Sequence, residues 1–304
     1  MAHLLAPRLV VVLAVACVQS ACAQSAKPER QPDPGERRAD SVIVWPAPAA
    51  VPDDLSIDLD VADGSSVAEQ TAALGTARVQ IRTHRQMGPM EGTFSALNLH
   101  DDESTSVDAA LDVIRTRGGR VVELAHTGAR NVAFQVDNTD FAADPNRMFT
   151  DAGRRRTLAD KSRDTPEARA ALEAFANDVL AAYAPGAPAV ITLHNNTDEN
   201  YGARSYLAGA EYETDAEAVT VHPGTDADDF FFVTDRGLYD DLVSRGFNAV
   251  LQDNEAATDD GSLSVWAAQQ GVPYVNVEAQ HGHRAEQARM IEALMDVLAE
   301  RAAR

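Results

Sequence analysis

The sequence contains very little cysteine. Of its 304 residues only Cys17 and Cys22 are cysteines, and both lie near the N-terminus. The body of the protein therefore has no thiols from which to build a disulfide framework or a cysteine-ligated zinc site. Any metal ion held there must be bound by histidine and carboxylate side chains.

Positive charge is also scarce. The chain has 26 Lys and Arg against 47 Asp and Glu, a formal net charge of −21, and its only lysines are Lys27 and Lys161. This argues against a nucleic-acid partner, because binding to a phosphate backbone needs clustered cations. Hydrophobic residues make up 45% of the chain, which is enough for a sizeable core and excludes a disordered or fibrous protein.

The N-terminal segment, residues 1–23, has the pattern of a signal peptide. Arg8 supplies a positive start, residues 9–16 form an apolar run, and a cleavage pattern surrounds Cys22. The apolar run is shorter than the ~20 residues that span a bilayer as a helix. The alternative is lipoprotein processing at Cys17 or Cys22, which would leave a lipid anchor. We therefore expect an exported protein, periplasmic or secreted.

The composition changes twice beyond this segment. Residues 24–40 contain three prolines and many charges, which predicts an extended tether, and residues 41–304 are globular in composition. In the globular part, β-branched runs alternate with helical patterns. This predicts one α/β domain with a mixed, largely parallel sheet of about eight strands flanked by helices.

The predicted elements can be placed along the chain. Strands are expected at 77–83, 93–99, 120–124, 131–136, 189–193, 230–234, 248–252 and 274–277, with a further one at 42–45. Helices are expected at 105–116, 166–183 with Thr165 as N-cap, 236–245, 262–270 and 284–303. Functional residues in such sheets gather where strands end, so the strand ends are where we look for chemistry.

Two predicted strands end on histidine. One leads into His100, with Glu103 three residues later, and another leads into His194. Imidazole and carboxylate suit tetrahedral zinc, and three such ligands leave a fourth position open, as catalytic zinc requires. Taken alone, the first pair also fits a polar strand end before a helix, and His194 also fits a hydrogen-bonded structural residue.

Two further segments add candidate residues. Asn146 and Arg147 follow Asp144 in a turn-rich stretch, which is also typical of an ordinary loop. An arginine at this place can form paired hydrogen bonds with a substrate carboxylate. The strand at 274–277 ends on Glu278, an ionisable group that is costly to bury unless it is paired or functional.

The order of these motifs resembles the zinc carboxypeptidase superfamily, which includes metallocarboxypeptidases, murein peptide amidases and the succinylglutamate desuccinylase and aspartoacylase branch. The motifs are H-x-x-E, D-x-N-R, a strand ending in L-H and a strand ending in E, and they span about residues 93–283. The resemblance implies that 41–304 is a zinc-carboxypeptidase-like catalytic domain with one zinc ion. It implies that the zinc ligands are His100, Glu103 and His194.

The resemblance also implies roles for the other candidates. Glu278 would be the general base that takes a proton from water and delivers it to the leaving amine. Asn146 and Arg147 would anchor a substrate carboxylate. Arg130 would stabilise the oxyanion, although an arginine at a strand end also fits a surface ion pair.

The implied activity is hydrolysis of an amide bond beside a carboxylate-bearing group, at a peptide C-terminus or in a cell-wall peptide. The expected partner is that peptide, or an N-acyl amino acid with a free carboxylate, and a monomer is expected. One alternative is an N-acyl amino acid deacylase of the aspartoacylase or succinylglutamate desuccinylase type. Another is a non-catalytic binding lipoprotein on the same fold.

Several polar residues near the motifs have open roles. Asp101 and Asp102 crowd the first motif and could weaken the Lewis acidity of zinc or bind a second cation. His281 and His283 could contact the site, form a separate metal site or lie in a solvated loop.

The remaining candidates fit structural roles. The acidic cluster from Asp226 to Asp229 lacks the spacing of a calcium loop and predicts a solvated turn before a strand. A catalytic tyrosine is not assigned among Tyr201, Tyr206 and Tyr239, each of which also fits a packing role. Three histidines without matching partners are predicted to be structural: His84, His126 and His222.

Overall fold

The computed structural model describes residues 56–60, 64–183 and 188–304. The predicted signal peptide at 1–23, the tether at 24–40 and the strand at 42–45 lie outside the described residues. The predicted domain at 41–304 is therefore seen from Ser56 onward, apart from 61–63 and 184–187.

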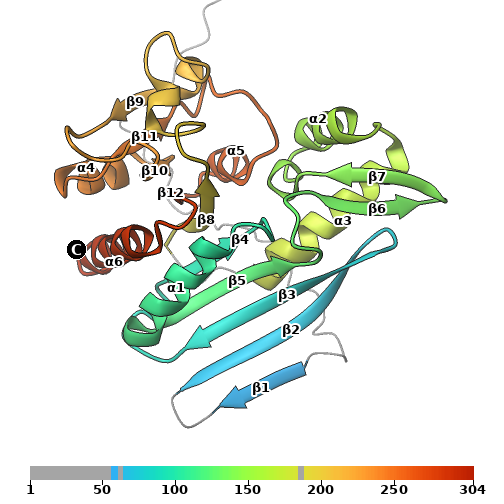
Figure 1. The fold of residues 1–304 in the computed structure, drawn as a ribbon, viewed down its shortest axis with the longest axis horizontal. Helices are drawn as coiled ribbons and strands as arrows, with labels where there is room; N and C mark the ends of the chain where they lie inside the picture. Colours follow the sequence, from blue (N-terminus) through green and yellow to red (C-terminus); the bar gives the residue numbers. More distant parts are fainter. Residues whose placement is uncertain (1–55, 61–63, 184–187) are drawn as a thin grey trace, which may run out of the picture. The chain divides into compact units, whose positions relative to one another are not determined.

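A mixed ten-stranded sheet forms the centre of the described chain, in the order β1-β2-β3-β5-β4-β8-β12-β10-β11-β9 (Figure 1). Pairing is parallel from β5 through β4 and β8 to β12, and between β10 and β11, and the other five pairs are antiparallel. The predicted mixed α/β sheet is confirmed, but it has ten strands where about eight were expected. The expectation of a largely parallel sheet was wrong, because only four of the nine strand pairs are parallel, three of them at the centre. Its strands are β1 (Ser56–Asp60), β2 (Ser65–Leu74), β3 (Ala77–Gln86), β4 (Ser95–Asn98), β5 (Gly119–Ala125), β8 (Val190–Asn196), β9 (Ala216–Thr220), β10 (Phe230–Val233), β11 (Ala249–Gln252) and β12 (Tyr274–Gln280).

The prediction was wrong about the segment 131–136. This strand, β6 (Val132–Val136), pairs with β7 (Thr139–Ala143) in a separate two-stranded sheet. Asp137 and Asn138 join the two strands, both with positive φ, a conformation that Asp and Asn adopt more readily than other residues with a side chain. The sequence prediction also missed β1, β2, β7 and β9, which lack the continuous apolar runs of the buried strands.

Within the described residues, six α-helices accompany the sheet. Five of them match the predicted segments to within one residue at each end, and Thr165 caps α3 as expected, with its Oγ1 accepting from the Ala168 amide at 3.2 Å. The sequence prediction missed α2, because its polar sequence buries only Gly153, Thr157 and Leu158. Among the described residues no helix is long and apolar enough to cross a membrane. The helices are α1 (Ser104–Arg117), α2 (Asp151–Lys161), α3 (Pro166–Tyr183), α4 (Arg236–Ser244), α5 (Leu263–Gln269) and α6 (Arg284–Ala302).

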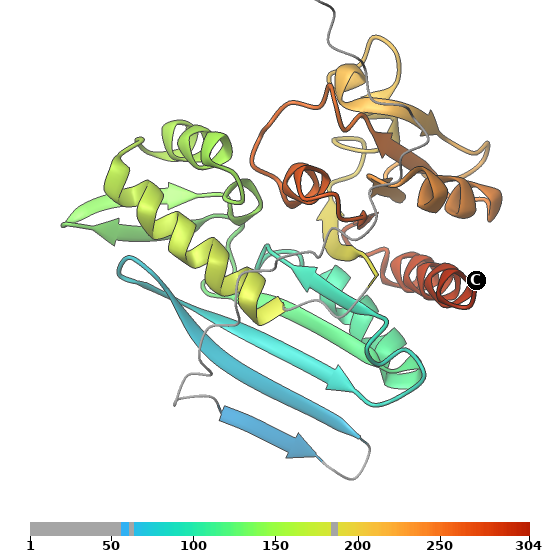
Figure 2. The ribbon, with the colours of Figure 1, turned by 180° about the vertical axis from the view of Figure 1, so that it is seen from behind.

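The sheet has a core on each face. On one face α1, α4 and α6 pack against strand residues such as Ile191 of β8, while α3 crosses the opposite face, where Phe175 shares a core with Val190 (Figure 2). Because side chains alternate along a strand, His194 lies on the same face as Val190. The candidate residues therefore gather on the α3 face, at the carboxyl ends of the central parallel strands.

Candidate metal centre and active site

Parallel strands bring the predicted metal ligands to one edge of the sheet. β4 ends two residues before His100, and His194 of β8 lies opposite Glu278 of its parallel neighbour β12. After His100 the chain turns, with the Glu103 amide donating to the His100 carbonyl at 3.1 Å, and Glu103 becomes the N-cap residue of α1. The Glu103 side chain makes no capping hydrogen bond, so its carboxylate faces the histidines instead.

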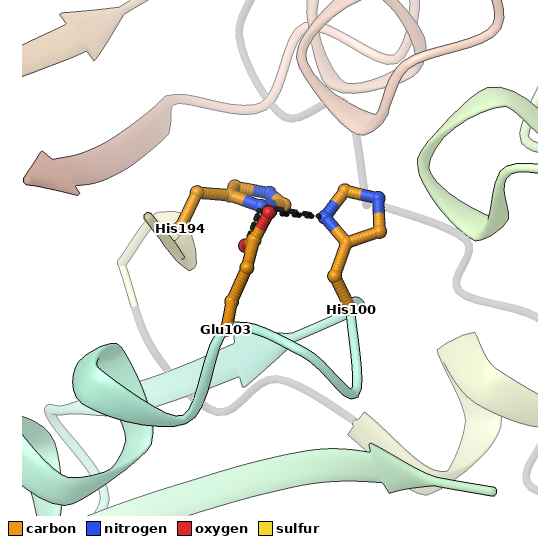
Figure 3. Close-up of side chains that lie close together, drawn as sticks. All are labelled: His100, Glu103 and His194. Carbon is orange, nitrogen blue, oxygen red and sulfur yellow. Dashed lines mark hydrogen bonds and ion pairs between the residues drawn. The ribbon is translucent and has the colours of Figure 1, made fainter. Parts of the chain in front are cut away.

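His100, Glu103 and His194 form one buried group (Figure 3). The Glu103 oxygens lie 2.9 Å from His100 Nδ1 and 2.8 Å from His194 Nδ1, and the two Nδ1 atoms are 3.1 Å apart. One potential ligand atom from each of the three residues lies within 4.8 Å of the other two. Ligand atoms ~2.1 Å from one tetrahedral zinc ion stand about 3.4 Å apart, so a small outward shift would admit the ion.

The protonation of this group also suits a cation site. Burial alone would lower the pKa of His100, but the Glu103 and Asp144 carboxylates raise it to about 9. Burial opposes the ionisation of Glu103, yet His194 and His100 hold the Glu103 pKa well below its usual range. Burial lowers the pKa of His194. The protein alone thus gathers positive charge on His100 beside an ionised carboxylate, and a bound metal ion would take over that charge.

Asp144 orients the first histidine. Its Oδ1 lies 2.8 Å from His100 Nε2, which turns Nδ1 toward Glu103 and His194. The Asp144 amide donates to Thr157 Oγ1 of α2 at 2.9 Å, and its Oδ1 also accepts from the Asn146 amide at 2.8 Å. Burial alone would raise the pKa of Asp144, but its hydrogen bond to His100 and nearby positive charges lower it. The sequence motif contained Asp144, but the sequence predicted no role for it.

Glu278 is a buried carboxyl group beside the proposed metal ligands. Only 4% of the residue is exposed, and Asn276 Nδ2 donates to its Oε2 at 2.8 Å. Burial, together with the negative charge of Glu103, raises the pKa of Glu278 to about 8. A carboxyl group with a raised pKa can gain and lose a proton near neutral pH, as a general base and acid must.

Arg130 directly contacts the group formed by His100, Glu103 and His194. Its Nη1 donates to Glu103 Oε1 at 2.6 Å, and its Nε lies 3.6 Å from Asp144 Oδ2. The side chain is 44% exposed and lines the same cavity as Glu278. A guanidinium in this place can reach a substrate oxygen bound next to Glu103, so its predicted oxyanion role stays a prediction with suitable geometry.

Asn146 and Arg147 stand at the cavity wall as well. Arg147 Nε lies 3.2 Å from Asp260 Oδ2, and Arg147 Nη1 donates to the Asn146 carbonyl oxygen at 2.7 Å. Asn146 Oδ1 accepts a hydrogen bond from the Leu263 backbone amide at 3.2 Å. Asn146 Nδ2 lies 3.4 Å from His194 Nε2. Burial opposes the charge of Arg147, but Asp260 and Asp144 raise its pKa. Their predicted role in binding a substrate carboxylate stays a prediction.

One cavity connects these residues. Its volume is about 940 Å³. Glu103, Arg130, Arg147, His194 and Glu278 all line it. Two of the proposed metal ligands, Glu103 and His194, are therefore accessible from the same space as the candidate base and the candidate carboxylate-binding arginine, whereas the His100 side chain is fully buried behind them. The space is large enough for a small peptide or an acylated amino acid.

The two acids of the first motif have different surroundings. Asp101 Oδ2 accepts from the backbone amides of His126 at 2.7 Å and Gly128 at 2.6 Å, so it fixes the loop that precedes Arg130. Asp102 lines the cavity. The structure gives Asp101 a loop-fixing contact that the sequence did not predict.

The His281 and His283 pair is divided between two surroundings. His281 lines the cavity, whereas His283 Nδ1 lies 2.9 Å from Asp229 Oδ2. Asp226, Asp229 and His283 form a second group with potential ligand atoms within 4.8 Å of one another. Asp229 Oδ1 already accepts from the Gln280 amide at 2.9 Å, so this group fixes the end of β12. The expected solvated turn is wrong for Asp228 and Asp229, which are both buried, although Asp226 is exposed.

Sequence reasoning missed the polar residues that support the strand ends. Gln287 of α6 is fully buried and donates to the carbonyls of His194 at 2.9 Å and Val277 at 3.1 Å, while accepting from Asn195 at 2.9 Å. No pattern in the sequence marks Gln287, because its partners come from strands far away along the chain. Asn276 carried a signal, since alternation along β12 places it on the same face as Glu278.

Comparisons with known proteins concern the fold. Neither a profile of a known protein family nor a curated protein sequence matches the chain. Among solved structures, an aspartoacylase family protein from Mesorhizobium loti has 15% identity and a TM-score of 0.39, covering 81% of this chain and 70% of its own. Murein-tripeptide amidase from Escherichia coli O157 has 14% identity and a TM-score of 0.36, covering 75% of this chain and 91% of its own.

Proposed function

We propose that this chain is an exported zinc-dependent hydrolase that cleaves an amide bond beside a carboxylate-bearing group. The convergence of His100, Glu103 and His194 carries the proposal, because residues predicted from two separate motifs each place one ligand atom within 4.8 Å of the others. Glu278 and Arg147 line the cavity beside them. Export is supported by the signal-peptide pattern of residues 1–23 alone.

The side chains divide the proposed reaction among themselves. A zinc ion held by His100, Glu103 and His194 would supply Lewis acidity and would lower the pKa of a water and of neighbouring Glu278. The Glu278 carboxylate accepts a proton from the attacking water and returns it to the nitrogen of the leaving amine. Arg130 donates hydrogen bonds to the carbonyl oxygen as negative charge develops there, a type of contact worth about 3–4 kcal/mol in other enzymes.

Arg147 selects the substrate. Its guanidinium is held by Asp260 and by the Asn146 carbonyl, so its position is fixed before a ligand arrives. A free carboxylate bound to it would set the distance between the scissile amide and Glu278. We therefore propose peptides with a free C-terminus, cell-wall peptides among them, as the substrate class.

The test combines metal content with hydrolysis. Purified protein should contain about one zinc per chain and should cleave peptides with a free terminal carboxylate but not the same peptides with an amidated C-terminus. Glu278→Gln should abolish turnover while keeping the metal. Glu211→Gln, which changes another acid of the same cavity, is the matched control and should stay active.

The outcomes separate the alternatives. Cleavage of N-acyl amino acids in place of peptides would indicate a deacylase of the aspartoacylase type. Stoichiometric metal and substrate binding without turnover would indicate a binding protein. Hydrolysis that survives both removal of the metal by a chelator and Glu278→Gln would contradict the proposed chemistry.

Export has its own experiment. Cell fractionation should find the mature protein outside the cytoplasm, with Gln24 as its first residue if residues 1–23 are removed as a signal peptide. Lipid on Cys17 or Cys22 would indicate the lipoprotein route instead. An intact N-terminus on cytoplasmic protein would contradict export.

A further inference from the structure

A row of buried polar side chains lies beneath the candidate base. Tyr274, Asn276 and Glu278 alternate along β12 and so share one face of the sheet. On the parallel neighbour β8, Thr192 stands opposite Asn276, and His194 stands opposite Glu278. All five residues are buried.

Hydrogen bonds connect this row in a continuous chain. The Tyr274 hydroxyl lies 2.6 Å from Thr192 Oγ1, and Thr192 Oγ1 donates to Asn276 Oδ1 at 3.3 Å. Asn276 Nδ2 then donates to Glu278 Oε2 at 2.8 Å. Burial raises the pKa of Tyr274, so its hydroxyl keeps its proton.

All hydrogen bonds of this row donate in the same direction, from Tyr274 toward Glu278. Thr192 has one hydroxyl proton, which it gives to Asn276, so the Tyr274 hydroxyl must be the donor to Thr192. With its oxygen facing the threonine, the Asn276 amide presents its NH₂ group to Glu278. As a base Glu278 must be ionised, and a flipped amide would then place its oxygen against a carboxylate oxygen, which is costly in a buried site.

We propose that Asn276, held by Thr192 and Tyr274, is a positioning residue for Glu278. Its amide fixes the plane of the carboxylate by engaging Oε2 and thereby assigns the proton transfer to Oε1. Asn276 itself gives up no proton, because its amide can donate a hydrogen bond both to the carboxylate and to the carbonyl oxygen of the carboxylic acid. The proposal rests on the proposed function of Glu278 as the base and adds the hydrogen bond that orients its carboxylate.

The orientation of a general base affects turnover more than it affects substrate binding. Proton transfer by a positioned base contributes roughly 10²–10⁴-fold to rate, and a misplacement of about 1 Å can cost about 10²-fold. Asn276→Leu, which keeps the approximate shape but removes the donor, should lower kcat by about 10- to 100-fold and leave KM within about twofold.

Variants of Thr192 give a matched pair. Thr192→Val keeps the shape and removes the hydroxyl, so it should lower kcat by about 3- to 10-fold, whereas Thr192→Ser keeps the hydroxyl and should restore the wild-type rate. The double variant Thr192→Val with Asn276→Leu should be no slower than Asn276→Leu alone, because both remove the same support.

Crystal structures of the purified wild type and of Asn276→Leu give a readout independent of turnover. The Glu278 carboxylate should hold one orientation in the wild type and a shifted or second orientation in the variant. Metal content and Tm, measured on every variant, should match those of the wild type closely enough to show that the proteins are folded and loaded.

Several results would overturn the proposal. These are an unchanged kcat in Asn276→Leu, a loss confined to KM, additive effects in the double variant, or an unchanged Glu278 orientation. A loss confined to KM would make Asn276 a substrate contact. If the zinc-loaded wild type hydrolyses nothing, the proposed function fails instead, and the orientation of Glu278 in the two crystal structures still decides whether Asn276 positions it.

Discussion

Replacing Asp144 with asparagine isolates the charge of the carboxylate that supports His100. The Asp144 Oδ1 atom lies 2.8 Å from His100 Nε2, and both side chains are buried. A hydrogen bond to a charged group contributes about 1.5–3 kcal/mol, against about 0.5–1.5 kcal/mol for a neutral pair. Asparagine can still accept this bond, so Asp144→Asn should lose the difference, on the order of 1.4 kcal/mol, or about tenfold in metal affinity. Asp144→Ala should lose the whole bond and weaken binding up to about 100-fold.

The affinity can be measured by competition for zinc with a chromophoric chelator at neutral pH. Asp102→Asn is the matched control, because it removes one negative charge from the same cavity and leaves the hydrogen bond between Asp144 and His100 in place. The control should bind zinc within about twofold of the wild type. Equal losses in Asp144→Asn and Asp102→Asn would show that only the overall charge of the cavity matters, and the reasoning from the Asp144 hydrogen bond would then be refuted.

Three further predictions concern stability and binding. In metal-free protein, the Tm of Glu278→Gln should exceed that of the wild type by a margin that grows from pH 4.5 to 8. The pKa of Glu278 is raised to about 8 in the folded wild type, so the wild type loses stability over this range as folding comes to require a proton that the unfolded chain has already released. A pH-independent difference in Tm would contradict this. Gln287→Leu should cost roughly 2–5 kcal/mol in urea unfolding, since it leaves its buried partners unpaired, and a loss below about 1 kcal/mol would contradict that role. Gly153→Ala should raise KM, because its new Cβ would lie 2.1 Å from Gly261 Cα and 2.8 Å from the Arg147 carbonyl; an unchanged KM would show that this contact does not position Arg147.

Chemistry that depends on residue type and order could be predicted from the sequence. The scarcity of cysteine directs any metal to histidine and carboxylate, and apolar runs that end in His100, His194 and Glu278 place these residues at strand ends. Strands and helices with strong apolar periodicity were predicted well, because burial requires that periodicity. β2 and α2, which are half-buried or polar, were missed for the same reason.

Tertiary structure decided how these residues meet. Glu103 comes within 3 Å of both histidines because β4 and β8 are parallel neighbours, a pairing that no local pattern specifies. The separate hairpin of β6 and β7 likewise depends on a turn at Asp137 and Asn138 and on what packs around it.

The supporting contacts are the least visible in the sequence. Asp144 supports His100 across 44 positions, and Gln287 reaches the His194 carbonyl across 93. The sequence by itself determined the ligand types, the acidic character and most buried elements, because these depend on composition and periodicity. Only the tertiary structure decided which buried polar groups pair, because the cost of an unpaired polar group is met by whichever partner the fold brings within hydrogen-bond distance.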